Sequence, residues 1–348
     1  MKTTVVIPNY NGIEYIRACL DSLRAISDED FAIIVVDNGS ADGSREIVEQ
    51  EYPEAELIAL SENTGFAAAV NTGINAVKTP YCILLNNDTE AKKGFVKNLE
   101  RRLDSDSRIF SVNSKMIQLH DPGKLDGCGD YYCALGWAYA YLKDAPANLA
   151  DRNNEGMQSD NDGASADMSG QNNMTLSKPR QIFSACGGAS AYRVDVLKEI
   201  GMFDELHFAY LEDVDVGYRA KIKGYINVFE PEAEVYHAGS GSSGSRYNTF
   251  KIELSSRNNV YLIIKNMPFL QILINLPFLL IGYLVKTAFF ILKGFGGIYV
   301  KGLINGLRLG FSAEGRAHRV RFRLSDLPSY VRIQLELWVN IVRRFLRI

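Results

Sequence analysis

The sequence predicts an α/β fold with a mostly parallel sheet, followed by a helical tail. In the first 118 residues, apolar runs of strand length alternate with stretches of helical periodicity. These runs are apolar on both faces, as expected for parallel strands covered by helices on both sides. The C-terminal part of the chain differs in charge: residues 257–348 hold 14 Lys and Arg against three acids, a net +11, and the remaining residues hold 24 against 38, a net −14. The two parts therefore face different surroundings.

Five apolar runs predict the strands of the first half, in this order: TTVVIP, FAIIVVDNGS, AELIALSENTG, PYCILLNNDT and RIFSVNSKMI. The stretch between the first two, residues 13–23, has the spacing of a helix that buries one face. The first four strands each end in a polar cluster, and these clusters begin at Asn9, Asp37, Glu62 and Asn86. Ligands of open α/β sheets bind beyond the carboxyl ends of the strands. We therefore expect the four clusters to meet in one crevice.

The second half of the catalytic part resumes after an insertion. Residues 144–181 are poor in large apolar side chains and predict a flexible insertion. Strand-like residues then follow at 182–193, a helix near 194–200 and a further strand at 227–238, before a Gly/Ser-rich loop that begins at Gly239.

The tail, residues 266–348, has the composition of a hydrophobic and basic helical region that associates with membranes. Residues 266–285 are twenty residues without a charge, about the length that spans a bilayer. Two Pro and three amides interrupt this run, and a basic segment follows it, so an interfacial or re-entrant segment, or two spans, fits better than one crossing. The last helix is cationic and amphipathic, as in helices on anionic leaflets. A buried core helix is the alternative for the apolar run. We place the boundary after residue 265, with a catalytic domain at 1–265.

Composition narrows the partners and the compartment. The net charge of −3 gives no reason to expect nucleic acid as a partner. The chain begins with a strand-like run rather than with a cationic and apolar leader, so we expect the catalytic part in the cytoplasm.

Candidate ligands of a metal ion follow two of the strands. Asp88 ends a buried run beside two Asn, where a carboxylate suits a hard divalent cation, although Asn-Asp-Thr is also a common turn or helix cap. His237 ends a later strand beside the Gly/Ser loop, where an imidazole serves as a metal ligand or as a structural group. Asp37 also ends a strand, and its carboxylate is a candidate acceptor for a nucleobase or ribose.

A cluster of acids predicts a general base. Glu212 and Asp213 follow an aromatic run, so desolvation raises their pKa toward the range of a useful base, and a solvated helix start is the alternative. Asp215 and Arg219 share a helix face and predict an ion pair instead.

Six segments in order closely resemble the inverting glycosyltransferases of family 2, especially the bacterial rhamnosyltransferase-like branch. They are VVIPNYNG, VVDNGSADGS, ENTGFAAAVNTGI, LLNNDT, FSACGGASAYR and GMFDELHFAYLEDVDVGYRAKIKGY, and they cover about residues 3–265. The resemblance implies a GT-A (Rossmann-like) fold that binds a nucleotide-diphosphate sugar and a divalent metal, Mg²⁺ or Mn²⁺. It implies transfer of a sugar, with rhamnose as a candidate, to a hydroxyl of a glycan or lipid-linked acceptor in cell-surface polysaccharide assembly.

The resemblance also assigns roles to single residues. Asp213 is the implied catalytic base, with Glu212 as second choice, and Asp88 and His237 are the implied metal ligands. Asn86 stands where many members carry an acid. The implied substrate-binding residues are Pro8, Tyr10, Asp37, Asn63, Gly65, Phe66, Asn71, Asn87 and Arg257. Cationic candidates to stabilise the departing diphosphate are Arg246, Arg257 and Lys265.

Two other classes of protein compete with this interpretation. A catalytically inactive, membrane-bound nucleotide-sugar-binding module would have the same groups without turnover. An NAD-dependent oxidoreductase needs a glycine fingerprint in the first β-α turn, where this chain has one Gly, Gly12. With a basic and apolar tail, we expect the enzyme at the cytoplasmic face of the cell membrane, peripheral or monotopic.

Overall fold

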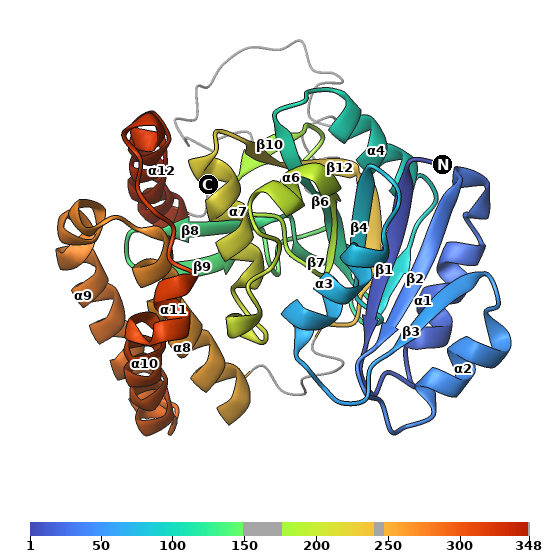
Figure 1. The fold of residues 1–348 in the computed structure, drawn as a ribbon, viewed down its shortest axis with the longest axis horizontal. Coiled ribbons are helices and arrows are strands. Elements are labelled where there is room, and N and C mark those ends of the chain that lie inside the picture. Colours follow the sequence, from blue (N-terminus) through green and yellow to red (C-terminus); the bar gives the residue numbers. More distant parts are fainter. Residues whose placement is uncertain (149–175, 240–246, 347–348) are drawn as a thin grey trace, which may run out of the picture.

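The computed structural model describes residues 1–148, 176–239 and 247–346. Figure 1 shows a central sheet with helices on both faces and a separate layer of helices at one end. That layer belongs to the tail, and the N-terminal strands lie at the opposite end of the molecule (Figure 1).

The described residues form a ten-stranded main sheet in the order β10-β12-β6-β11-β4-β1-β2-β3, with β5 beside β12 and β7 beside β6. The strands are β1 (Thr3–Asn9), β2 (Phe31–Asp37), β3 (Ala55–Ala59), β4 (Tyr81–Leu85), β5 (Thr89–Ala91), β6 (Ile109–Gln118), β7 (Leu125–Gly127), β8 (Asp130–Cys133), β9 (Trp137–Ala140), β10 (Arg180–Ile182), β11 (Ala189–Arg193) and β12 (Ile226–His237). Strands β1 to β4 are mutually parallel, whereas β11 lies antiparallel between β4 and β6. The predicted α/β fold with a mostly parallel sheet is confirmed. Strands β8 and β9 form a separate hairpin-like pair.

The α-helices of the described residues connect these strands and form the tail. They are α1 (Ile16–Arg24), α2 (Ser44–Glu51), α3 (Phe66–Ala76), α4 (Phe95–Asp104), α6 (Val194–Glu199), α7 (Glu212–Ile222), α8 (Thr249–Asn266), α9 (Phe269–Leu292), α10 (Gly296–Phe311), α11 (Ala313–Ala317) and α12 (Leu327–Leu346).

The core of the sheet follows from the alternation of side chains along its strands. In β1, Val5 and Ile7 pack on one face with α1 and α4, whereas Val6 packs on the other face with α3. Because side chains alternate with a period of two, strands buried on both faces must be apolar at nearly every position. This arrangement explains the continuous apolar runs of the sequence.

A further core cluster joins the catalytic part to the tail. Phe183 and Tyr218 share this cluster with Leu279 of α9 and with Ile333 and Leu337 of α12. Helix α10 packs closely against α8. The residues of α10 that face α8 include the glycines at 302, 306 and 310, which have no side chain to keep the helices apart. The predicted boundary after residue 265 therefore falls inside α8, one residue before its end.

The structure bears on two other predicted segments. The predicted insertion at 144–181 ends in β10, and Leu176 is buried in the core, so its last residues belong to the fold. Residues 149–175 of this insertion, and residues 240–246 of the Gly/Ser loop with Arg246, lie outside the described part of the chain.

Candidate active site

A cavity of about 500 Å³ lies beyond the carboxyl ends of the strands, where the sequence predicts a crevice. Most of the predicted site residues line it together: Pro8, Tyr10, Asn63, Gly65, Phe66, Asn87, Asp88, Glu212, Asp213 and His237. They come from segments that are more than two hundred residues apart in the chain. The topology brings them together because parallel strands present their carboxyl ends at one edge.

Three predicted substrate-binding residues lie elsewhere. Asn71 is buried in α3, donates to the carbonyl of Phe203 at 2.8 Å and borders a second cavity. Arg257 donates to the carbonyls of Leu206 and His207 at 2.9 Å. Asn71 and Arg257 therefore stabilise the backbone through hydrogen bonds to carbonyl groups.

Asp37 is the third predicted substrate-binding residue that does not line the cavity. Its neighbour Asn38 lines the cavity instead. Asp37 is buried and accepts hydrogen bonds from Asn9 at 3.0 Å and from the backbone N–H of Ser40 at 3.1 Å. Asn38 lines the cavity, and its side-chain oxygen accepts from Thr64 at 2.9 Å. Successive side chains of a strand point to opposite faces. A shift of one residue along the chain therefore separates Asp37, whose side chain is buried, from Asn38, whose side chain lines the cavity.

The predicted metal ligands converge in the structure. His237 Nε2 lies 3.3 Å from Asp88 Oδ1, and Nδ1 lies 2.8 Å from Asp126 Oδ2. Lys143 in turn contacts Asp126 Oδ1 at 2.5 Å. A carboxylate and an imidazole nitrogen are suitable donors for Mn²⁺ or Mg²⁺, and a second carboxylate on the far ring nitrogen is the usual way to orient such a His. The residues present therefore fit a divalent cation.

The protonation of His237 depends strongly on the charges of Asp88 and Asp126. Burial by itself lowers the pKa of His237, but hydrogen bonds with Asp126 and Asp88 outweigh burial and raise the pKa to about 9. Without a cation, the imidazolium thus holds the two carboxylates together. A cation bound by Asp88 and Nε2 takes the place of that proton.

The predicted base also lines the cavity. Asp213 is in the first turn of α7, where its Oδ1 accepts from the backbone N–H of Val214 at 2.7 Å and its Oδ2 from that of Gly187 at 3.3 Å. Burial raises the pKa of Asp213. These hydrogen bonds fix the orientation of a carboxyl group that is poised to accept a proton.

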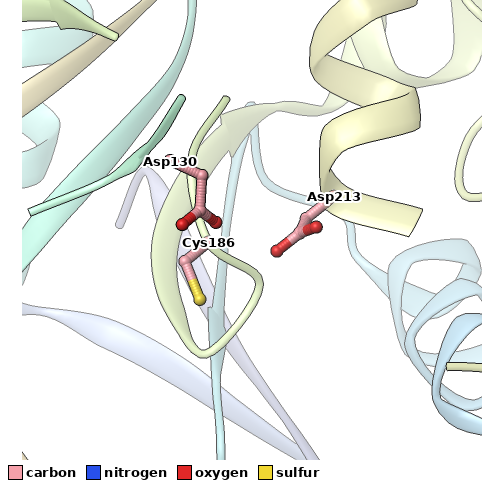
Figure 2. A group of neighbouring side chains, drawn as sticks. All are labelled: Asp130, Cys186 and Asp213. Atoms are coloured by element: carbon pink, nitrogen blue, oxygen red, sulfur yellow. The ribbon is translucent and has the colours of Figure 1, made fainter. Parts of the chain in front are cut away.

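Asp130 and Cys186 stand beside this base, as Figure 2 shows. Their candidate ligand atoms and that of Asp213 all lie within 4.8 Å of one another. Burial, and then the charge of Asp213, raise the pKa of Asp130 well above its usual value. Glu212 is buried as well, its Oε2 has no hydrogen-bond partner among the described residues, and burial raises its pKa well above the usual range.

A strained segment precedes the base. Phe208, Tyr210 and Leu211 have φ values of 62°, 69° and 68°, in the left-handed region that side-chain-bearing residues rarely adopt. Asn258 of α8 is fully buried and places its amide nitrogen 2.8 Å from the carbonyls of His207, Ala209 and Tyr210. Helix α8 therefore holds the loop that leads into Glu212 and Asp213.

Several residues of this cavity were not predicted from the sequence. Asn38, Asp126, Lys143 and Cys186 line it, and Asp130 lies beside its wall. Asp126 and Asp130 lie in or next to strands of three and four residues, which are too short for a periodic signal. The one available signal was the pair of acids four residues apart in DGCGD, directly before the aromatic pair Tyr131-Tyr132.

Comparisons with known proteins agree on the family. Residues 4–123 match the family model of glycosyl transferase family 2. N-acetylglucosaminyl-diphospho-decaprenol L-rhamnosyltransferase of Mycobacterium tuberculosis is 24% identical over 265 residues, which cover 69% of this chain and 77% of that protein. Teichoic acid poly(glycerol phosphate) polymerase of Staphylococcus epidermidis is 33% identical over 122 residues, or 34% of this chain. The match covers 17% of the length of that polymerase. Glycosyltransferase GlyA of Streptococcus pneumoniae is 35% identical over 105 residues, which cover 29% of this chain and 15% of that protein.

Solved structures share the fold at low identity. A mannosyltransferase from Pyrobaculum calidifontis, in complex with GDP-Man and Mn²⁺, has a TM-score of 0.52 and 15% identity, over 96% of this chain and 87% of that one. TarS residues 1–349 from S. aureus, in complex with UDP-GlcNAc, has a TM-score of 0.55 and 17% identity, over 97% and 89%. The sheet thus has the GT-A fold of these structures. Over residues 4–123, the chain is similar to glycosyltransferase family 2.

Proposed function

We propose that the protein is an inverting glycosyltransferase that moves a sugar from a nucleotide-diphosphate sugar to a hydroxyl of a glycan or lipid-linked acceptor. The observation that carries this proposal is that two chemically different groups line one cavity. Asp88 and His237, 3.3 Å apart, suit the diphosphate and its cation, and the oriented carboxyl group of Asp213 suits the acceptor. An inverting transfer needs both groups at one site, because the nucleophile attacks from the face opposite the leaving group.

The proposed reaction assigns one proton and one leaving group. Asp213 accepts the proton of the acceptor hydroxyl, while the hydroxyl oxygen forms a bond to the anomeric carbon of the donor sugar. The bond from that carbon to the diphosphate oxygen breaks, and its electron pair leaves with the nucleoside diphosphate. Gly187 and Val214 keep the carboxylate of Asp213 oriented for this proton transfer.

The departing diphosphate carries the negative charge that develops in this reaction. A divalent cation, Mg²⁺ or Mn²⁺, held by Asp88 and His237 would stabilise that charge as a Lewis acid. Asp126 would orient His237 for this task through its 2.8 Å contact with Nδ1. Lys143 and Lys251, which also line the cavity, would add positive charge near the same group.

We further propose a role in cell-surface polysaccharide assembly at the cytoplasmic face of the cell membrane. The relatives support this setting, since one is an L-rhamnosyltransferase of a diphospho-decaprenol acceptor and another a teichoic acid polymerase. Rhamnose is therefore the first donor sugar to test. One helix of the described residues, α9, is long and apolar enough to cross a membrane, with a mean hydropathy of 1.8.

Hydrolysis and transfer measured with a panel of nucleotide sugars test the proposal. We expect slow donor hydrolysis without acceptor that depends on Mn²⁺ or Mg²⁺ and that Asp88→Asn abolishes. Binding without turnover of any donor, under all metal conditions, would identify an inactive nucleotide-sugar-binding module instead. Turnover of NAD with no nucleotide-sugar binding would support the oxidoreductase.

A further inference from the structure

Helix α9 has the reverse of the polarity expected for a helix in water. Its buried face contains Gln271, Asn275, Leu279 and Gly282. Its exposed face is almost entirely apolar, with exposed fractions of 80% for Phe269, 69% for Leu284 and 87% for Leu292 among others. A helix of a soluble domain buries its apolar stripe and exposes its polar one. The outer surroundings of α9 must therefore be apolar.

Polar contacts hold α9 against the domain along its length. Tyr218 donates to Gln271 at 2.9 Å, near the start of the helix, and Tyr283 donates to Asn259 at 2.8 Å twelve residues later. In between, the amides of Asn275 and Gln334 exchange two hydrogen bonds of 2.8 Å. At a rise of about 1.5 Å per residue, residues 271 to 283 cover about 18 Å of helix.

Close packing makes this attachment specific. Trp137 donates from its indole nitrogen to the carbonyl of Gly282 at 3.1 Å. A Cβ at position 282 would lie 2.0 Å from the carbonyl oxygen of Leu135, so only Gly allows the helix this close to the turn before β9.

These contacts exclude a transmembrane crossing by α9 while it remains docked. The hydrocarbon core of a bilayer is about 30 Å thick. If α9 crossed it, the partners Tyr218, Asn259 and Gln334 and the helices that carry them would enter the hydrocarbon with it. If α9 lies parallel to the membrane, its outer face enters one leaflet and its polar face stays on the protein side.

Two more helices extend the same end of the molecule (Figure 1). The outer stripe of α12 is exposed and apolar: Val331, Leu335, Trp338, Val342 and Phe345. The outer stripe of α10 is similar: Val300, Ile304, Leu307 and Phe311. Exposed cations accompany these stripes, among them Lys293, Arg308 and Arg332.

Charge favours a membrane over a second copy of the chain as the occupant of this face. Residues 257–348 carry a net +11, so two copies of the face would repel one another. An anionic leaflet attracts the same charge and accepts the apolar stripes in its acyl region.

We propose that α9, α10 and α12 form a monotopic docking face, inserted into one leaflet of an anionic bilayer with α9 parallel to its plane. This inference deepens the proposed function and rests on it in one respect, the lipid-linked acceptor. Tyr247 packs on Phe289 and Phe290 near the end of α9, and Phe250, three residues further on, lines the cavity. The mouth of the cavity therefore lies near the level of the membrane, where a lipid-linked hydroxyl is presented.

Binding to vesicles tests the docking face. We expect the full chain to float with vesicles that contain 30% phosphatidylglycerol, and Leu273→Glu with Leu284→Glu to lower the bound fraction by roughly tenfold or more. Both side chains are exposed, so the fold should survive, and donor hydrolysis reports whether it does. Ile13→Glu, at an exposed Ile far from the tail, is the matched control and should bind like wild type.

Each outcome separates the docking face from the proposed function. Vesicle binding without donor hydrolysis would reject the proposed function and keep the face. Donor hydrolysis without vesicle binding would reject the face, and a lipid-free dimer that becomes monomeric in the Glu variant would reassign it to self-association.

Labelling of the two ends of α9 tests its orientation. Pro268→Cys and Lys293→Cys place a thiol at each end, and protein bound to the outside of preformed vesicles is treated with a membrane-impermeant maleimide. The in-plane arrangement predicts that both thiols react, against a low background because four of the five native Cys are buried. If one end reacts only after detergent is added, α9 crosses the bilayer and the in-plane proposal is wrong.

Discussion

Two adjacent acids at the start of α7 have different surroundings, and their difference decides which one acts as the base. Both line the cavity, but Asp213 accepts two backbone hydrogen bonds, whereas one oxygen of Glu212 is buried without a partner among the described residues. A general base must combine a fixed orientation with access to the substrate. The geometry therefore favours Asp213.

Replacing the base tests this assignment. Asp213→Asn keeps the volume of the side chain but cannot accept a proton, so we expect kcat to fall roughly 10²- to 10⁴-fold while donor binding persists. Steady-state transfer kinetics and donor titration measure the two quantities. An inactive Glu212→Gln next to an active Asp213→Asn would move the role by one residue. In the wild type, the raised pKa of Asp213 places the loss of kcat on acidification above pH 3.8.

Glu212 should weaken the fold as the pH rises. Burial raises its pKa in the folded state, so the folded chain binds more protons than the unfolded chain and the free energy of unfolding falls as pH increases through that range. Glu212→Gln removes this dependence. We expect a gain of about 1–3 kcal/mol in the free energy of unfolding at pH 8, and little gain at pH 4, where both residues are neutral. Urea unfolding at the two pH values gives the comparison, and an equal gain at both would argue against the ionised Glu212 as the cause.

We propose that Asp126 is a positioning residue that acts through His237. Loss of its charge should loosen the imidazole and weaken the metal site, so Asp126→Asn should raise the Mn²⁺ concentration for half-maximal donor hydrolysis about 10- to 100-fold. Excess Mn²⁺ should restore most of the activity, which a misfolded variant would not allow. Asp121→Asn, at an exposed acid paired with Lys124, serves as the control.

At the scale of elements, the loop before α7 depends on a helix that lies some fifty residues further along the chain. Left-handed φ values at three residues with side chains cost about 1–3 kcal/mol each. Asn258 offsets part of this cost through the carbonyls that its amide contacts. Helix α8 thus holds the proposed base, Asp213, in place.

Asn258→Ala should release this loop. We expect a loss of about 2–4 kcal/mol in the free energy of unfolding, because the partly buried carbonyls of Ala209 and Tyr210 lose the amide donor of Asn258, while that of His207 keeps Arg257. We also expect a fall in kcat that exceeds any change in the KM for the donor, since the loop leads into Asp213. Asn305→Ala on α10 is a control of the same chemistry at a less buried site. A variant with normal kcat would show that the loop keeps its conformation without Asn258.

The sequence predicted the elements better than it predicted their side-chain contacts. Periodicity located β1, β2 and β4 because a strand buried on both faces is apolar at nearly every position. The resemblance placed Arg257 at the substrate, whereas its contacts with two carbonyls arise from a left-handed loop that no periodic pattern reveals. Asp126 and Asp130 were not predicted from the sequence, because tertiary packing, and not local spacing, brings them to the cavity.

At the scale of the whole molecule, the composition of the chain changes near residue 265, but the packing of the core continues across this point. The charge of the chain changes sign there, yet Phe183 and Tyr218 share a core cluster with residues of α9 and α12. Lys265 and Asn266, at the end of α8, also contact both oxygens of Asp215 in α7, at 2.8 Å and 2.7 Å. The tail therefore supports the helix that carries the base.

A chain that ends at Lys265 should consequently fail to fold stably, although its sequence contains the complete cavity. It would lose five buried side chains of the shared core: Met267, Leu279, Tyr330, Ile333 and Leu337. At about 1.5–3 kcal/mol for each, this loss of about 7–15 kcal/mol is comparable to the whole stability of a typical domain. We expect this shortened chain to aggregate or to melt without cooperativity, as circular dichroism and light scattering would detect. The full chain with Leu273→Glu and Leu284→Glu keeps these contacts and should melt cooperatively in the same buffer. If the shortened chain is instead soluble, melts cooperatively and binds the donor, the tail is a separable domain and the shared core is dispensable.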